Sequence, residues 1–235
     1  MAGGQGGGCD HGAMRRFVHD HSLSLVTLGA FVVIWLGGQA VAGHRAYNEE
    51  QRAHGEPTVD MAEYVTRAEF GEATFENWES EFLQMGVYVL LTAWLLQRGS
   101  AESRPLDGDP ALDEDPRGHQ ADPDAPWPVR HGGLPLRIYE HSLSIALLGL
   151  FVLAFLGHLV TGAHTYSAEQ VTHGEPGVSA LGYLFRSQFW FESLQNWQSE
   201  FLAVGTLVVL SVFLRQRGSP ESKPVHAPHR QTGSE

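Results

Sequence analysis

The chain has 235 residues, with 15 Lys and Arg against 27 Asp and Glu and a formal net charge of −12 at pH 7. This acidic balance argues against a nucleic-acid partner, because nucleic acids bind basic surfaces. Cys9 is the only cysteine, which excludes an intramolecular disulfide and a cysteine-ligated metal site.

The charges are segregated along the chain, and four apolar runs contain no Asp, Glu, Lys or Arg. Uncharged runs that approach ~20 residues are candidate transmembrane helices. The sequence therefore predicts an all-α, multi-pass protein of the cell membrane, in contact with the lipid bilayer. The predicted spans cover about 22–43, 78–97, 142–163 and 197–215.

The first span follows a Gly-rich tail, 1–13, that we expect to be disordered. Beyond the membrane the helix is expected to continue to Gly55, which suits the C′ position, and Pro57 prevents its further extension. Glu50 and His54 lie four residues apart on this extension. That spacing serves either an ordinary side-chain pair or two ligands of one metal ion.

The second span begins at NWESEFL, residues 77–83. Its apolar part, 82–96, makes only ~22 Å of helix, which is shorter than the ~30 Å hydrocarbon core. Glu81 is therefore expected just below the outer membrane surface, on the same helical face as Asn77. Trp78 is predicted to anchor the helix at the interface.

A Pro- and Asp-rich segment, 99–136, is predicted to be a disordered cytoplasmic linker. It separates two halves that repeat each other, over 14–98 and 137–217, and a disordered tail, 218–235, follows. The matched stretches are HDHSLSLVTLGAFV with YEHSLSIALLGLFV, YNEEQRAHGEP with YSAEQVTHGEP, NWESEFL with NWQSEFL, and QRGSAESRP with QRGSPESKP.

The two predicted repeats differ in two informative places. Their alignment slips by one residue between His44 and Tyr47, where the first repeat has an extra residue. The second repeat also has Gln198 where the first has Glu79, which argues against a role for Glu79.

The motifs HGEP, NWESEF and QRGSxESKP, taken as a set, resemble an uncharacterised family of bacterial membrane proteins that is described as a domain of unknown function. The resemblance covers both repeats and omits the N-terminal tail and the central linker. It implies a membrane protein and brings no activity with it.

Membrane orientation follows from Lys and Arg, which are enriched in cytoplasmic loops. The tails and the linker hold eleven of these residues, and the two loops between paired helices hold four. Both termini are therefore predicted to be cytoplasmic. The loops should face outward, with short amphipathic helices in 58–75 and 177–193. Since each repeat has two spans, the repeats are parallel, and Glu81 and Glu200 should lie at equal depth.

The first candidate site is a polar cluster at the outer end of the four-helix bundle. Glu81 and Glu200 are expected to face the interior as a buried pair that shares a proton or a cation. The cluster comprises Asn77, Glu81, Asn196 and Glu200, with Trp78 and Trp197 as interface anchors.

A divalent metal is the alternative occupant, because four-helix bundles with inward carboxylates and imidazoles hold di-metal centres. The Glu-x-x-His spacing of those centres is absent, which weakens this hypothesis. His158 matches Gly38 of the first repeat and has no facing histidine at its depth, so haem is not expected. The candidate metal ligands are His44, Glu50, His54, His164, Glu169 and His173.

Three classes of function remain open. The first is a scaffold or interaction protein, with a structural polar lock and a partner that is a second copy or another membrane protein. The second is a metal or redox site, and the third is a small transporter or proton-conducting protein that uses Glu81 and Glu200. The sequence assigns no catalytic residue, and it leaves open whether the chain is an enzyme.

Overall fold

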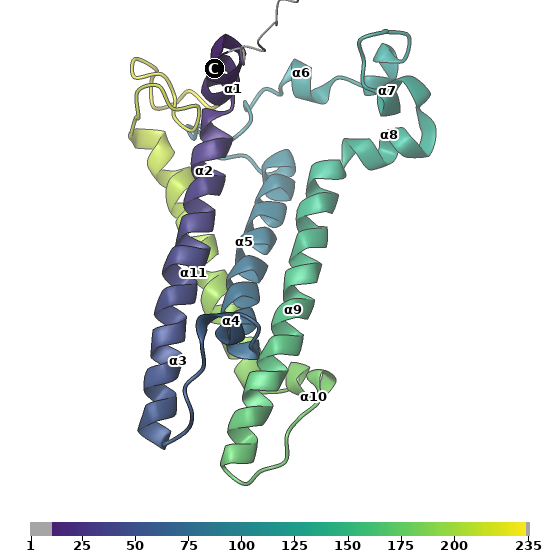
Figure 1. Cartoon of the computed structure of the whole chain (residues 1–235). Coiled ribbons are helices and arrows are strands. Elements are labelled where there is room, and N and C mark those ends of the chain that lie inside the picture. The colour runs from purple at the N-terminus through teal and green to yellow at the C-terminus, as the bar shows by residue number, and fades with distance from the viewer. Residues whose placement is uncertain (1–10, 234–235) are drawn as a thin grey trace, which may run out of the picture. The chain divides into compact units, whose positions relative to one another are not determined.

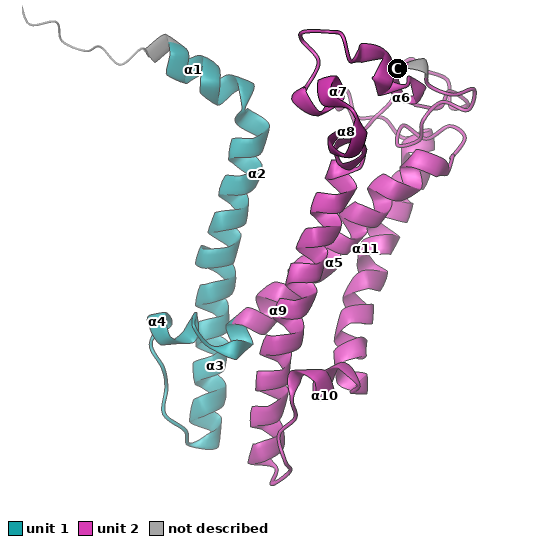
Figure 2. Cartoon of the chain, turned by 90° about the vertical axis from the view of Figure 1, so that its right-hand side faces the viewer, with its two compact units in different colours: residues 1–70 teal, residues 71–235 magenta. Residues whose placement is uncertain are grey.

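The computed structural model in Figure 1 describes residues 11–233. Every regular element in that range is a helix, so the prediction of an all-α chain is confirmed. The chain divides into two compact units, residues 1–70 and 71–235 (Figure 2), which are described separately.

Unit 1 contains one long helix in which a π-helical segment interrupts the α-helix near the middle. A π-helical segment arises where one extra residue is inserted into an α-helix. Here that segment contains Gly37 and Gly38. The elements are α1 (His11–Asp20), α2 (Ser22–Val32), the π segment η1 (Val33–Gln39), α3 (Ala40–His54) and α4 (Met61–Tyr64).

Glycine–tyrosine contacts locate the extra residue that the first half of the sequence has relative to the second. In unit 1 a Cβ added at Gly43 would collide with the Tyr64 hydroxyl, and in unit 2 a Cβ at Gly162 would lie 2.8 Å from the Tyr183 ring. The two glycine–tyrosine pairs span equal lengths of chain, so the extra residue lies before Gly43. The alignment predicted this residue between His44 and Tyr47. In the structure it is accommodated by the π-helical segment η1.

Unit 2 contains three long helices, and two of them begin earlier than predicted. Helices α5 and α11 start at Ala68 and Ser187, about ten residues before the predicted span starts. NWESEFL therefore lies in the body of α5. The elements are α5 (Ala68–Trp94, whose first three residues belong to unit 1), α6 (Pro110–Asp113), the 3₁₀ segment η2 (Pro116–His119), α7 (Trp127–His131), α8 (Gly133–Glu140), α9 (Ser142–Thr172), α10 (Ala180–Leu184) and α11 (Ser187–Phe213).

The C-terminal ends of helices α3 and α9 follow from their sequences. Helix α3 ends at Gly55, whose φ of 75° is the left-handed conformation that favours glycine, and Gly174 after α9 has a φ of 79°. Short helices occur in both following loops. The Asp60 carboxylate caps α4 and the Ser179 hydroxyl caps α10, each accepting a backbone N–H from the first turn.

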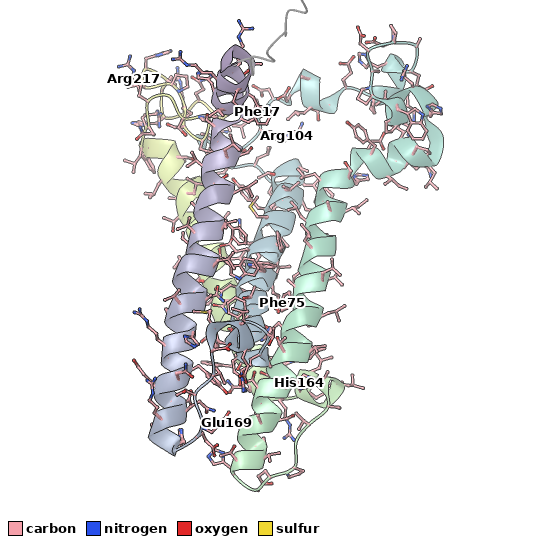
Figure 3. All side chains as sticks on the ribbon, in the orientation of Figure 1. Phe17, Phe75, Arg104, His164, Glu169 and Arg217 are labelled. Carbon is pink, nitrogen blue, oxygen red and sulfur yellow. The ribbon has the colours of Figure 1, made fainter. Side chains whose placement is uncertain are left out.

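Helices α5 and α9 approach each other closely because one partner at each contact is glycine. A Cβ added at Gly157 on α9 would lie 2.6 Å from the ring of Phe75 on α5 (Figure 3). A Cβ added at Gly86 on α5 would lie 2.9 Å from the Leu148 side chain. Small residues at such positions let two helix backbones approach closely.

The segment predicted as a disordered linker differs from that prediction, since 99–136 contains α6, η2 and α7. Asp109 and Asp115 cap the first two of these, and each is followed by proline at the first helical position. An aspartate N-cap before an N1 proline is a strong local helix start. The Pro- and Asp-rich composition that suggested disorder thus encodes short capped turns.

The described part of the C-terminal tail is also held in place. Lys223 is buried, and its ammonium group donates to the backbone carbonyls of Gly99, His229 and Gln231. The segments 1–10 and 234–235 of the predicted tails lie outside the described residues.

Two helices are long and apolar enough to cross a membrane. They are Ser22–His54, whose most apolar 18-residue stretch has a mean hydropathy of 1.9, and Ser142–Thr172, where the corresponding value is 2.4. Large apolar side chains on these helices are exposed, among them Leu23, Val26, Leu143 and Leu153. Helices α5 and α11 do not reach the same threshold over the described residues.

Candidate functional site

A buried histidine lies between two carboxylates in unit 2. His158 on α9 has its Nδ1 atom 2.8 Å from Oε2 of Glu79 on α5, and both side chains are fully buried. Its Nε2 atom lies 3.4 Å from Oε2 of Glu192 on α11, a longer and weaker contact. One imidazole therefore connects acidic groups from two other helices.

Glu79 has hydrogen-bond partners on both of its oxygens. The indole N–H of Trp197 on α11 donates to Oε1 at 3.0 Å, while Oε2 faces His158. Because both contacts cross between helices, Glu79 ties α5 to α9 and to α11 with no exposure to solvent. A fully buried charge of this kind requires such partners.

Glu192 forms the more accessible side of the site. The Tyr183 hydroxyl donates to its Oε2 atom at 2.5 Å and the Gln188 amide donates to Oε1 at 2.6 Å. Burial raises the pKa of Tyr183 above its ordinary value, so the phenol remains a donor. Burial also acts to raise the pKa of Glu192, but hydrogen bonds from His158 and Tyr183 outweigh it and lower that pKa.

Two further glutamates of α5 extend the acidic cluster. The Asn196 amide donates to Oε1 of Glu76 at 2.6 Å. Glu72 lies beside Tyr183, since a Cβ at Gly162 would touch both side chains. Burial raises the pKa of Glu72 to about 7, against a hydrogen bond with Thr165 that lowers it.

The arrangement requires a proton beyond those of the ordinary neutral imidazole. A neutral imidazole has one N–H and one acceptor nitrogen, and it cannot donate to two carboxylates at once. With carboxylates at both nitrogens, either the imidazole is protonated or one carboxyl is. The site is therefore suited to binding a proton and to passing it between Glu79, His158 and Glu192.

The predicted Glu81 and Glu200 pair is placed differently from expectation. Their charges are close enough to interact, but Glu81 is exposed and Glu200 is only partly buried. Asn77 is exposed and donates to the carbonyl of Ala73, one turn earlier on its own helix. Of the four predicted residues, Asn196 joins the buried cluster.

The two predicted interface tryptophans have different surroundings. Trp197 bonds Glu79 inside the site. Trp78 is half-buried, and its ring lies edge-on to Phe75 with centroids 5.9 Å apart.

The predicted metal ligands are engaged with the backbone or exposed. His54 and His173 each direct Nδ1 to the main-chain carbonyl of the glutamate four residues earlier, Glu50 and Glu169, and not to its carboxylate. His44 contacts the carbonyl of Val59, and His164 is exposed (Figure 3). Within residues 11–233, no group of three or more His, Cys, Asp or Glu is arranged to hold a metal ion.

Sequence reasoning missed the acidic and basic residues of this site, although the aligned halves contain a signal for them. Each one lacks an acidic or basic match in the other half, and His158 falls opposite Gly38 or, after the π insertion, Gln39. The matches of the glutamates are Phe191 for Glu72, Gln195 for Glu76, Gln198 for Glu79 and Ala73 for Glu192.

Comparison with known proteins gives one match. The family model described as "Domain of unknown function (DUF6766)" matches residues 14–234, and so includes the central linker that the resemblance was expected to omit. No curated protein and no solved structure matches the chain.

Proposed function

The chain belongs to the DUF6766 family, whose function is unknown, and from that premise we propose that it is a multi-pass membrane protein that binds and transfers a proton. The proton-binding groups are Glu79, His158 and Glu192, and the direction of transfer is across the membrane. The chain has four spans in two parallel repeats, with both termini in the cytoplasm.

Three observations support the membrane arrangement. Two helices are long and apolar enough to cross a bilayer, and their large apolar side chains are exposed. The apolar parts of α5 and α11 occupy the matching positions of each repeat. The glycine–tyrosine contact and the capped short helix recur in each half.

The depth of His158 supports a role within the membrane. From Ser142, where α9 begins, to His158 the helix rises about 24 Å, within a hydrocarbon core of about 30 Å. An ionisable residue at such a depth is a functional candidate by default, because its burial in lipid is costly unless it is paired. Glu79 and Glu192 supply that pairing.

The observation that carries the proposal is the contact of both imidazole nitrogens with carboxylate oxygens. Glu192 is partly exposed while Glu79 is sealed, so the histidine separates an accessible acid from an inaccessible one. Histidine changes charge near neutral pH, which makes it suited to relaying a proton between two such groups.

A structural lock is the second candidate, and one observation favours it. Glu79 has no exposed surface, and both of its oxygens bond partners on other helices. A side chain with this environment holds α5, α9 and α11 together whether or not the proton moves.

Proton flux into liposomes separates the two candidates. Purified protein is reconstituted around a pH-sensitive dye, and a potassium diffusion potential supplies the driving force. We expect the wild-type chain to acidify the lumen faster than empty liposomes, Glu79→Gln to abolish the difference, and the exposed control Glu81→Gln to retain it. If wild-type liposomes match empty ones while Glu79→Gln lowers thermal stability, the lock is correct and proton transfer is refuted.

A further inference from the structure

A second pair of carboxylates lies at the opposite end of α5, at the QRGS motifs. Glu102 follows the first motif and Glu221 occupies the same place after the second. The Tyr88 hydroxyl, on α5, donates to Oε2 of Glu102 at 2.8 Å.

Hydrogen bonds made by side chains bring the two motifs together. The Ser100 and Ser211 hydroxyls lie 2.7 Å apart, and the Ala101 N–H donates to Ser211 at 3.2 Å, which joins the first motif to α11. The buried Lys223 ammonium bonds the carbonyl of Gly99, which joins the tail after the second motif to the first. Glu102 and Glu221 are thereby held within reach of each other.

The geometry around Glu102 lacks one donor. Its Oε1 atom is buried and has no hydrogen-bond partner, and the Glu221 side chain is close enough to Glu102 to interact with it. Two ionised carboxylates are acceptors only and cannot bond each other. A single proton between them supplies the missing donor.

The nearby cations do not neutralise this pair. Lys223 donates to three backbone carbonyls, and Arg215 donates to the carbonyls of Ser211, Val212, Leu214 and Ala227. Arg104, labelled in Figure 3, pairs with Asp113 at 2.5 Å. Burial raises the pKa of Glu102, the Tyr88 hydroxyl opposes that rise, and Glu221 raises the pKa further.

We propose that Glu102 and Glu221 bind one shared proton, as one carboxyl and one carboxylate, and exchange it with water at this end of the bundle. Glu221 is exposed, so the proton is accessible from the aqueous phase. The proposal rests on the proposed function in assigning this pair as the inner terminal of the proton path.

One face of α5 connects the pair to the buried histidine site. Polar side chains recur there every four residues, at Glu76, Ser80, Gln84 and Tyr88. Ser80 and Gln84 are buried. Residues at i and i+4 share one helical face, so these groups form a polar line along the apolar part of the helix.

Infrared difference spectroscopy between acidic and alkaline pH tests the shared proton directly. All variants are made in a Glu72→Gln background, because the Glu72 carboxyl has a pKa of about 7 and would give a similar band. In that background we expect a carboxyl band that titrates above the ordinary range of glutamate. That band should be lost in Glu102→Gln and also in Glu221→Gln, because either change leaves one carboxyl without its partner. The exposed control Glu175→Gln should keep the band, and thermal unfolding checks that each variant is folded.

The flux assay distinguishes failure of the shared-proton proposal from failure of the proposed proton transfer. If the band persists in either folded variant, the shared proton is refuted whatever the flux. If both variants lose the band and Glu102→Gln also reduces flux to the level of Glu79→Gln, the assignment as inner terminal is supported. Flux that is unaffected in folded Glu102→Gln overturns that assignment, whereas absence of flux in the wild type refutes the proposed function and leaves the proton pair standing.

Discussion

Glu79→Gln is the substitution that tests the buried site most directly. Glutamine keeps the volume of glutamate and one carbonyl oxygen, so the bond from Trp197 can be retained. The contact with His158 changes, because the amide carries no charge to stabilise a protonated imidazole. The variant therefore removes the ionic part of the site without opening a cavity.

The size of the effect follows from complete burial of both partners. Removal of one member of a buried ion pair costs about 3–5 kcal/mol of unfolding free energy. Because the tryptophan bond is retained in Glu79→Gln, we expect a loss at the lower end of this range, about 3 kcal/mol. For a chain of this length, 1 kcal/mol corresponds to about 2–4 °C in Tm. Glu79→Gln should therefore lower Tm by about 6–12 °C.

Tryptophan fluorescence during heating in detergent micelles measures this change. Glu81→Gln is the matched control, since Glu81 belongs to the same motif but is exposed, and its effect should stay within about 0.5 kcal/mol. His158→Gln should be non-additive with Glu79→Gln, with a coupling of about 0.5–3 kcal/mol. Equal unfolding temperatures for Glu79→Gln and Glu81→Gln would refute the reasoning.

Three other predictions concern packing, pH and topology. Gly157→Ala places a Cβ 2.6 Å from the Phe75 ring, so it should lower Tm by several degrees, and unchanged Tm would contradict the close approach of α5 and α9. The pKa of Glu72 is raised from 4.5 to about 7, so the folded state binds more protons than the unfolded state and loses stability as pH rises through that window. The Tm of Glu72→Gln should therefore fall less with rising pH than the Tm of the wild type. Parallel curves of Tm against pH for the two proteins would contradict this prediction. With the native cysteine replaced, a cysteine at Arg52 should react with an impermeant reagent in intact cells and one at Asp113 should not, and the reverse pattern would invert the topology.

Helix content was readable from the sequence because long uncharged runs and helix-stop residues are local signals. The end of α3 at His54 before Gly55 matches the prediction, since glycine there adopts a φ of 75°. The starts of α5 and α11 were not readable, because the polar first turns of these helices resemble loop sequence. Their helical state depends on packing, as with fully buried Phe189 near the start of α11.

Which residues of NWESEFL face the interior could not be predicted either, because this also depends on packing. Short length suggested that Glu81 enters the membrane edge, and Asn77 shares its face. Which face of α5 is buried depends on where α9 approaches it, and that is set by Gly157 and Gly86. The result is that Glu79 is buried and Glu81 exposed.

The extra residue of the first half, relative to the second, was predicted at another position for lack of a local marker. Alignment can move a one-residue gap along a helix at little penalty, whereas a π turn has a definite position. Residues 33–39 take that position in unit 1. Only the tyrosine contacts at Gly43 and Gly162 reveal it.

The two proposed repeats contribute different groups to the buried histidine site, and this explains why their identical motifs did not predict its residues. Residues present in both halves supply fixed hydrogen-bond donors, namely the Tyr183 hydroxyl, the Trp197 indole and the Asn196 amide. At the buried histidine site, each group that can gain or lose a proton occurs in one half only, in contrast to Glu102 and Glu221, which occur in both. A scaffold used twice needs its donors twice, but one buried proton needs one set of acids and one histidine, because a second set of like charges at the same depth would repel the first. At the buried histidine site, the differences between the halves, and not their identities, therefore mark the residues that carry the proposed chemistry.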